Sequence, residues 1–167
     1  MEREYTACTF RLDGHDRHFL WYADEPDGVV VGASGEMVTF ASEAELLAFG
    51  ATEGISWPLD FTVSYDLDAV AAWTAQRDAE AIDCIMMLNA WNLFVDIAAT
   101  FSCKLLEPRG ANAVYDKIFW GNNLPTMTPP GEHYVPAWSQ EEADVLVGVC
   151  KAGLSLLRRA IESPVAR

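Results

Sequence analysis

The longest unbroken apolar segment of the chain runs from Ala81 to Phe101 and contains neither Gly nor Pro. Nearly every position in it is apolar, and the polar residues Asn89, Asn92 and Asp96 recur at steps of three and four. On an α-helix this spacing places the three side chains in one narrow stripe. A helix that is apolar around most of its circumference is normally a core helix, so we expect residues 81–101 to form the central helix of the fold.

The first forty residues have the pattern of a β-meander. Short runs rich in aromatic and β-branched residues alternate with turn sequences such as Asp13-Gly14 and Ser34-Gly35, which supply residues that tolerate a positive φ. We therefore expect a small antiparallel sheet of three or four strands within residues 1–40. The expected strands lie near residues 5–12, 18–22, 29–31 and 37–40.

The rest of the chain, residues 42–163, is expected to be mainly helical. Ser42 with Glu45 and Ser139 with Glu142 form capping boxes, in which the Ser hydroxyl and the Glu carboxylate satisfy free amides at a helix start. Besides the central helix, the pattern predicts helices from 42 to about 50, from 66 to about 78, over 113–120 and from 139 to a stop at Pro164. Residues 51–64 are expected to be irregular.

One segment, residues 121–138, combines four prolines with several large apolar side chains. Proline lacks a backbone donor, so this segment cannot form a regular helix and would make a poor central strand. We call it the strap, and we expect its apolar residues to hold it against the rest of the fold.

These elements predict a single α+β domain over residues 1–167, with the small sheet followed by a helical bundle. At 167 residues, 51% of them hydrophobic and 22% charged, the chain has the composition of an ordinary globular protein. It is long enough to bury a sizeable core.

The net charge of -14 is unevenly distributed: residues 1–80 hold sixteen acidic and four basic residues. Without a basic patch, binding to nucleic acid or to an anionic membrane is not expected. The negative electrostatic field of the protein would instead attract a basic protein as its partner. We take Asp24, Glu25, Asp27, Glu43 and Glu45 as the candidate partner-binding surface.

Localisation follows from two further features. Asp83 and the polar stripe would be costly in hydrocarbon, which argues against reading the central helix as a membrane span. The N-terminal residues show no apolar signal core, so we expect a cytoplasmic protein.

The search for catalytic chemistry finds no motif for a phosphate, a cofactor or a metal ion, and we assign no catalytic residue. The cysteines lack ligand spacing and are expected to be buried reduced thiols: Cys8, Cys84, Cys103 and Cys150. His15 and His18 are expected to lie at a surface turn.

The polar stripe has two interpretations. In the first, Asn89, Asn92 and Asp96 are structural and face solvent or hold the backbone of the strap. In the second, they form a ligand or enzyme pocket with His133 and Tyr134 of the strap.

The segments LNAWNLFVDIA and YDKIFWGNNLPTMTPPGEHYVPAW, with the SQEE that follows, resemble a family of small uncharacterised bacterial proteins. Some acidic members of this kind resemble immunity proteins of toxin systems. The resemblance covers about the C-terminal half and brings no site residue with it, but it favours binding over enzymatic activity. We therefore expect a non-enzymatic protein that binds a basic toxin domain. The alternatives are the small-molecule pocket and a self-associating structural module, since the sequence does not determine the oligomeric state.

Overall fold

Two long antiparallel strands begin the fold, and the Asp13-Gly14 pair forms the turn between them. The computed structural model describes residues 3–162. Strand β1 (Glu4–Leu12) pairs along its whole length with β2 (His15–Ala23). Both turn residues have a positive φ, 53° for Asp13 and 75° for Gly14. This is the left-handed backbone that Gly adopts freely and Asp tolerates, which explains the position of the turn.

Five α-helices follow, and each corresponds to a predicted helix. They are α1 (Glu43–Glu53), α2 (Leu67–Gln76), α3 (Cys84–Thr100), α4 (Ala111–Gly121) and α5 (Gln140–Glu162), with a short 3-10 helix, η1 (Ala79–Ala81), before α3. The predicted α+β class is therefore confirmed. Pro164, the predicted stop of the last helix, lies outside the described residues.

Two helix boundaries differ from the prediction. Helix α1 continues past Gly50 and ends at Gly54, which adopts a left-handed conformation (φ 68°). Helix α3 begins at Cys84 instead of Ala81, because the Asp83 carboxylate accepts a hydrogen bond from the Met86 amide (3.0 Å) and caps the helix there.

The sheet has four strands in the order β3-β2-β1-β4, with β3 (Gly28–Val29) and β4 (Thr62–Asp66) at its edges. The predicted number of strands is confirmed, but the prediction of a purely antiparallel meander is wrong. Strand β4 pairs in parallel with β1 and comes from the segment 51–64 and its neighbours, where we expected irregular chain.

The last strand predicted for the meander, residues 37–40, does not form. The Met37 amide donates instead to the Ala160 carbonyl in α5 (2.8 Å), which ties this segment to the C-terminal helix. Two isolated antiparallel bridges, His18–Phe40 and Val31–Met37, are what remains of the predicted pairing.

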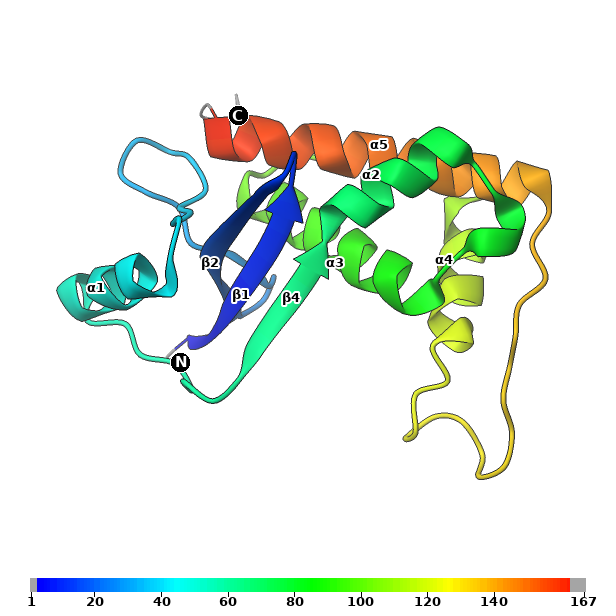
Figure 1. Cartoon of the computed structure of the whole chain (residues 1–167), viewed down its shortest axis with the longest axis horizontal. Helices are drawn as coiled ribbons and strands as arrows, with labels where there is room; N and C mark the ends of the chain where they lie inside the picture. The colour runs from blue at the N-terminus through cyan, green and yellow to red at the C-terminus, as the bar shows by residue number, and fades with distance from the viewer. Residues whose placement is uncertain (1–2, 163–167) are drawn as a thin grey trace.

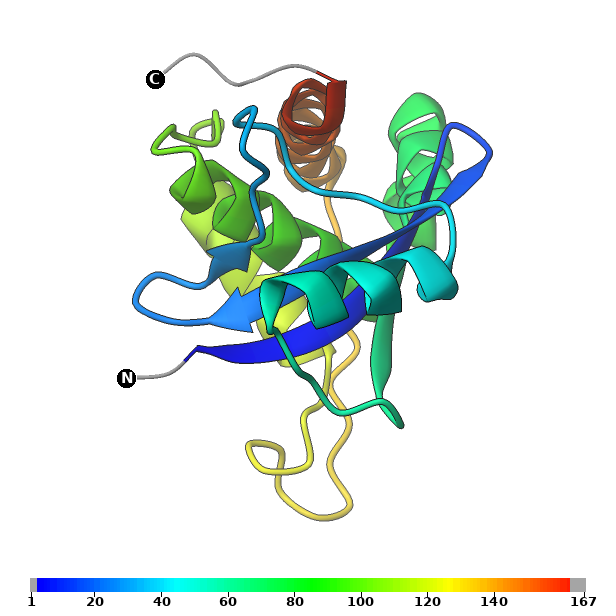
Figure 2. The same cartoon turned by 90° about the vertical axis from the view of Figure 1, so that its left-hand side faces the viewer.

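The sheet lies between α1 and the other helices (Figures 1 and 2). On the α1 side, Ala7 and Leu20 of the sheet pack with Leu46 in a small apolar cluster. On the other side α3 packs against the sheet, α2, α4 and α5, and its side chains contribute to the main core, as predicted for the central helix. Helices α3 and α5 pack tightly where Gly153 faces the buried ring of Phe94; a Cβ at Gly153 would overlap that ring.

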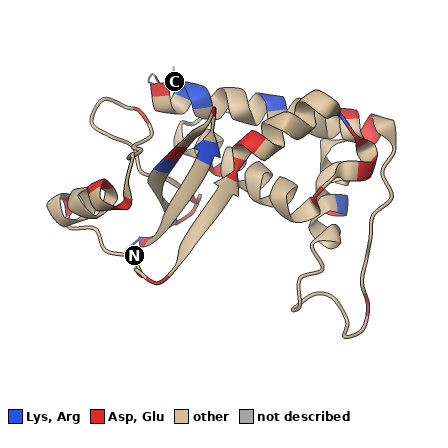
Figure 3. Ribbon diagram, in the orientation of Figure 1, with Lys and Arg blue, Asp and Glu red and all other residues tan. Residues whose placement is uncertain are grey.

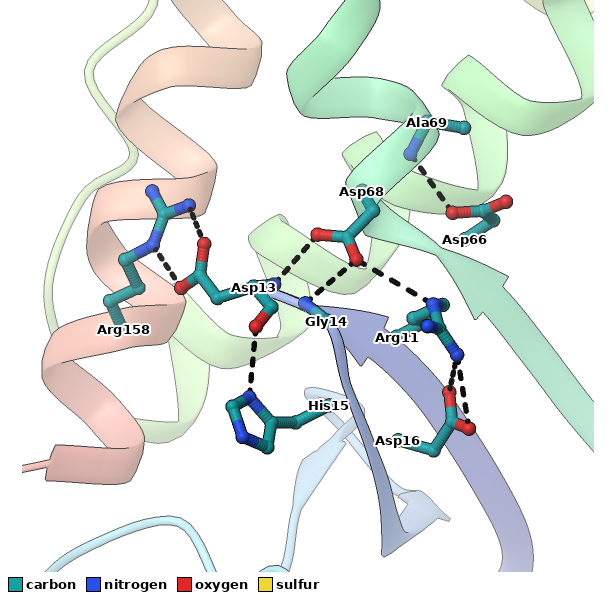
Figure 4. A network of polar contacts seen from close by, with 9 residues as sticks. All are labelled: Arg11, Asp13, Gly14, His15, Asp16, Asp66, Asp68, Ala69 and Arg158. Atoms are coloured by element: carbon teal, nitrogen blue, oxygen red, sulfur yellow. Dashed lines mark hydrogen bonds and ion pairs between the residues drawn. The ribbon is translucent and has the colours of Figure 1, made fainter.

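The tip of the β1–β2 hairpin is fastened to α2 and α5 by polar contacts (Figure 4). The Asp68 carboxylate accepts hydrogen bonds from the backbone amides of Asp13 (2.6 Å) and Gly14 (2.9 Å). The Arg158 guanidinium donates two more to the Asp13 carboxylate, at 2.8 and 2.9 Å, and holds the pKa of that carboxyl below its ordinary value. Three segments distant in sequence therefore meet at this turn.

We expect Asp68→Ala to lower the free energy of unfolding by about 1–2 kcal/mol, because two hairpin amides lose their acceptor. Urea unfolding followed by circular dichroism measures this change. Asp16→Ala is the matched control: it removes an exposed carboxylate paired with Arg11, and such pairs contribute less than about 1 kcal/mol. Equal unfolding midpoints for the two variants would contradict this role of Asp68.

Candidate functional site

The strap projects from the body of the molecule between α4 and α5 (Figure 1). Its two ends are packed: Cys84 and Pro136 lie against Gly121, and Trp138 lies under the Lys117 ammonium, which is 5.0 Å from the ring centroid. The middle of the strap is exposed. The prediction that its apolar residues hold it against the fold is therefore right at the ends and wrong in the middle.

One side chain holds the two limbs of the strap together. The Asn123 amide nitrogen donates to the carbonyls of Tyr134 (2.9 Å) and Gly121 (3.0 Å), while its oxygen accepts from the Tyr134 amide (2.6 Å). Asn123 has a positive φ of 50°, a conformation that Asn accepts more readily than most residues. The strap thus closes through a side chain instead of a strand ladder.

The strap presents large apolar side chains to solvent. The exposed fractions are 49% for Trp120, 37% for Leu124, 48% for Met127, 44% for Tyr134 and 74% for Val135, and Ile85 at the start of α3 is 60% exposed. A hollow of about 610 Å³ lies within the strap and is lined by Trp120, Met127 and Tyr134. Clustered apolar side chains of this kind mark contact surfaces more often than scattered ones do.

Carboxylates line the two hollows beside this cluster, and no Lys or Arg lines either of them. Glu132 lines the hollow within the strap, and Glu80 and Asp83 line a second hollow, of about 530 Å³, between the strap, η1 and the start of α3. No Lys or Arg occurs in the strap (Figure 3). We define the strap surface as the apolar side chains together with these carboxylates: Ile85, Trp120, Leu124, Met127, Tyr134, Val135, Glu80, Asp83 and Glu132.

The five acidic residues proposed from sequence lie in two separate places. Asp24, Glu25 and Asp27 form the turn between β2 and β3, while Glu43 and Glu45 begin α1. The chain just before α1 bridges to His18 through Phe40. About 20 Å of strand, six residues, separates His18 from Asp24. In Figure 2 the turn between β2 and β3 lies at the end of these strands, away from the start of α1.

Several of these acids already have intramolecular partners. The Asp24 carboxylate is 2.9 Å from the Arg3 guanidinium, and the Asp27 carboxylate accepts from the Asp24 amide (3.0 Å). The Glu45 carboxylate accepts from the Ala41 amide (2.9 Å), as its place in the capping box predicts. The five residues therefore do not form one continuous surface.

The polar stripe of α3 faces a different hollow. Asn89, Asn92 and Asp96 line a space of about 470 Å³ between α3 and the sheet. His133 and Tyr134 line the strap hollows instead. The structure therefore brings the three stripe residues together but does not add the two strap residues to them.

The other wall of this hollow comes from the sheet. Trp21 of β2 and Tyr65 of β4 line it, with Phe61 just before β4 and Asp27 in the β2–β3 turn. Sequence reasoning missed these residues. The alternation of Val63 and Tyr65 is a strand signal, but the preceding Gly and Pro led us to treat the segment as irregular.

Asp96, one of the residues that line the hollow, is half-buried. The Trp21 indole donates to its Oδ2 (2.8 Å), which fixes the orientation of the carboxylate. Burial raises the pKa of Asp96, and the nearby Asp27 raises it further, although the Trp21 hydrogen bond lowers it. Because the folded state holds the proton more tightly, protonation of Asp96 adds stability as the pH falls toward the ordinary range of the group.

Asn92 has a structural role as well, because its Oδ1 accepts a hydrogen bond from the Tyr115 hydroxyl (2.9 Å) and so links α3 to α4. This is consistent with the structural interpretation of the stripe for Asn92. Asn92 does not contact the strap through this bond, so the predicted link between stripe and strap is not seen there.

Two of the cysteines, Cys8 and Cys150, are unsuited to nucleophilic chemistry at neutral pH. Cys8 and Cys150 are buried, and burial raises the pKa of each thiol to about 12. Cys84 and Cys103 are partly buried. Within residues 3–162, no three His, Cys, Asp or Glu side chains gather as metal ligands would.

No protein-family model, curated protein or solved structure matches this chain. Among the described helices, none has both the length and the apolar character needed to cross a membrane.

Proposed function

We propose that this protein binds a basic protein through the strap surface. The observation that carries the proposal is the exposed apolar cluster of the strap, beside which Glu80, Asp83 and Glu132 line two hollows that no Lys or Arg lines. Tyr and Trp anchors contribute much of the energy of protein contacts, and a rim of one charge sign selects a partner of the opposite sign. The net charge of -14 supports the same kind of partner.

The partner that we propose is a basic toxin domain, which makes the protein an immunity protein without enzymatic activity. Support comes from the resemblance described above, because the segment that carries most of it, residues 115–138, includes six of the nine residues of the strap surface. The acids at 24–27 and 43–45 act at longer range in this proposal. They raise the rate of encounter, while the strap surface makes the contact.

The test is to capture partners from a lysate of the source cell at low and high salt, then to measure the purified pair by calorimetry. We expect a basic toxin domain whose affinity falls with salt. Tyr134→Ala should weaken binding about 30-fold or more, the loss typical of an interface anchor. Glu80→Lys with Glu132→Lys should weaken it as strongly, since the rim then repels the partner.

Leu59→Ala is the matched control for the apolar change. Leu59 is 68% exposed but lies in the loop before β4, outside the strap surface, so its removal should leave the affinity unchanged. Glu25→Lys should slow association without changing the dissociation rate. An acidic partner, or a basic one whose affinity survives Tyr134→Ala, would overturn the proposal.

A further inference from the structure

The hollow between α3 and the sheet has the chemistry of a binding site, and it lies apart from the strap surface. We propose that it binds a small organic cation, an amine with an aromatic or aliphatic body. This proposal goes beyond the protein contact proposed above and does not depend on it. Its volume of about 470 Å³ lies within the usual range for small-molecule sites, about 300–1,000 Å³.

The walls of the hollow suit the body of such a ligand. Trp21, Tyr65 and Phe61 supply aromatic rings, and Val63 and Leu93 supply aliphatic contact between them. Phe61 is 58% exposed although it is a large apolar residue beside an opening. Aromatic faces attract ammonium groups electrostatically, most strongly where water is partly excluded.

The charge in the hollow is unbalanced. Asp96 and Asp27 both line it, and no Lys or Arg is among its lining residues. Elsewhere in the described chain, carboxylates such as Asp13 and Asp144 pair with arginines. Asp96 instead receives a hydrogen bond from a neutral indole, although it is half-buried beside another carboxylate.

A bound ammonium group would compensate this charge directly. The Trp21 indole occupies Oδ2 of Asp96, which leaves Oδ1 to accept a hydrogen bond from the ligand. Asn89 on the same stripe adds an amide oxygen at the wall. An anionic ligand would be repelled by two carboxylates, and a neutral ligand could donate a hydrogen bond to them but would gain no attraction between opposite charges. A divalent metal ion fits less well, since Ca²⁺ takes about six to eight oxygen ligands and has no use for aromatic walls.

The test uses three probes of nearly equal size: phenethylamine, phenethyl alcohol and phenylacetate. Each is titrated into the isotopically labelled protein, and binding is followed at the Trp21 indole N–H, which is assigned by its loss in Trp21→Phe. We expect phenethylamine to shift this resonance in a saturable way. The alcohol and the carboxylate should bind at least about tenfold more weakly, since neither brings a positive charge to the two carboxylates of the hollow.

Asp96→Asn keeps the size of the side chain and an oxygen for the Trp21 indole, but it removes the charge, so phenethylamine affinity should fall at least about tenfold. Asp27→Asn, which keeps an acceptor for the Asp24 amide, should weaken binding in the same direction. Asp116→Asn is the matched control, because Asp116 is an exposed carboxylate of α4 outside the hollow. Equal binding of amine and alcohol, unchanged binding in folded Asp96→Asn, or no shift of Trp21 with phenethylamine would overturn the proposal.

Discussion

Replacing Gly153 with alanine is expected to lower the free energy of unfolding by about 2–3 kcal/mol. The sign of this change is informative, because replacing Gly with Ala at an exposed position inside a helix normally stabilises the protein by about 1 kcal/mol. At this position the new Cβ would overlap the ring of Phe94, which is fully buried between α3 and α5. The ring cannot turn into solvent, so the two helices must move apart and the core between them loosens.

Urea unfolding of Gly153→Ala measures the loss, and Ser155→Ala is the matched control on the same helix. Ser155 is exposed, so its replacement should stabilise α5 slightly through helix propensity. The double variant Gly153→Ala with Phe94→Leu should be less destabilised than the sum of the two single variants, because the smaller side chain makes room for the new methyl group. A stabilised Gly153→Ala would show that α3 and α5 are not in contact at this point.

The helices of this fold were predictable because their signals are local. Ser42, Asp66 and Ser139 each precede an apolar-periodic segment and accept a hydrogen bond from the first turn of the helix. The uninterrupted apolar run after Asp83 identified the central helix for the same reason. Gly50 misled the prediction of the end of α1, since its lack of a side chain makes room for the Trp57 ring and does not end the helix.

The sheet was less predictable because its pairing is not local. Strand β4 joins β1 across more than fifty residues, and a short parallel edge strand has no turn sequence to announce it. The Met37 amide is taken by the Ala160 carbonyl, which no pattern near residue 37 reveals. Such pairings depend on which segments meet in three dimensions.

The candidate sites show the same limit. The spacing of Asn89, Asn92 and Asp96 correctly placed three side chains on one face of α3. Sequence reasoning then assigned the strap as the opposite wall, whereas Trp21 and Tyr65 of the sheet form it. The strap was identified from its prolines, but its exposure was not, because composition does not show whether apolar residues on a loop find a surface to cover.

Removing the Asn123 side chain is expected to release the strap without unfolding the rest of the protein. Three hydrogen bonds, two to Tyr134 and one to Gly121, depend on this side chain, and the strap has no strand ladder to replace them. We expect the Tyr134 amide in Asn123→Gly to exchange with solvent about 10–100-fold faster, which corresponds to a loss of about 1–3 kcal/mol of local stability. Hydrogen exchange followed by NMR measures the rate.

The choice of replacement separates the side chain from the backbone, because Gly adopts the positive φ of residue 123 without strain and Ala does not. Asn123→Gly therefore tests the hydrogen bonds alone, and Asn123→Ala should add strain to their loss. Asn123→Asp keeps an acceptor for the Tyr134 amide but loses both donated bonds, so its exchange rate should lie between those of wild type and Asn123→Gly. The exchange rates of the α3 amides should be unchanged in all three variants, since Asn123 takes no part in the core.

If the strap surface binds a partner as proposed, Asn123→Gly should also weaken that binding, because the limb that carries Tyr134 must then be ordered during association. A Tyr134 amide that stays protected in Asn123→Gly would mean that other contacts hold the strap closed.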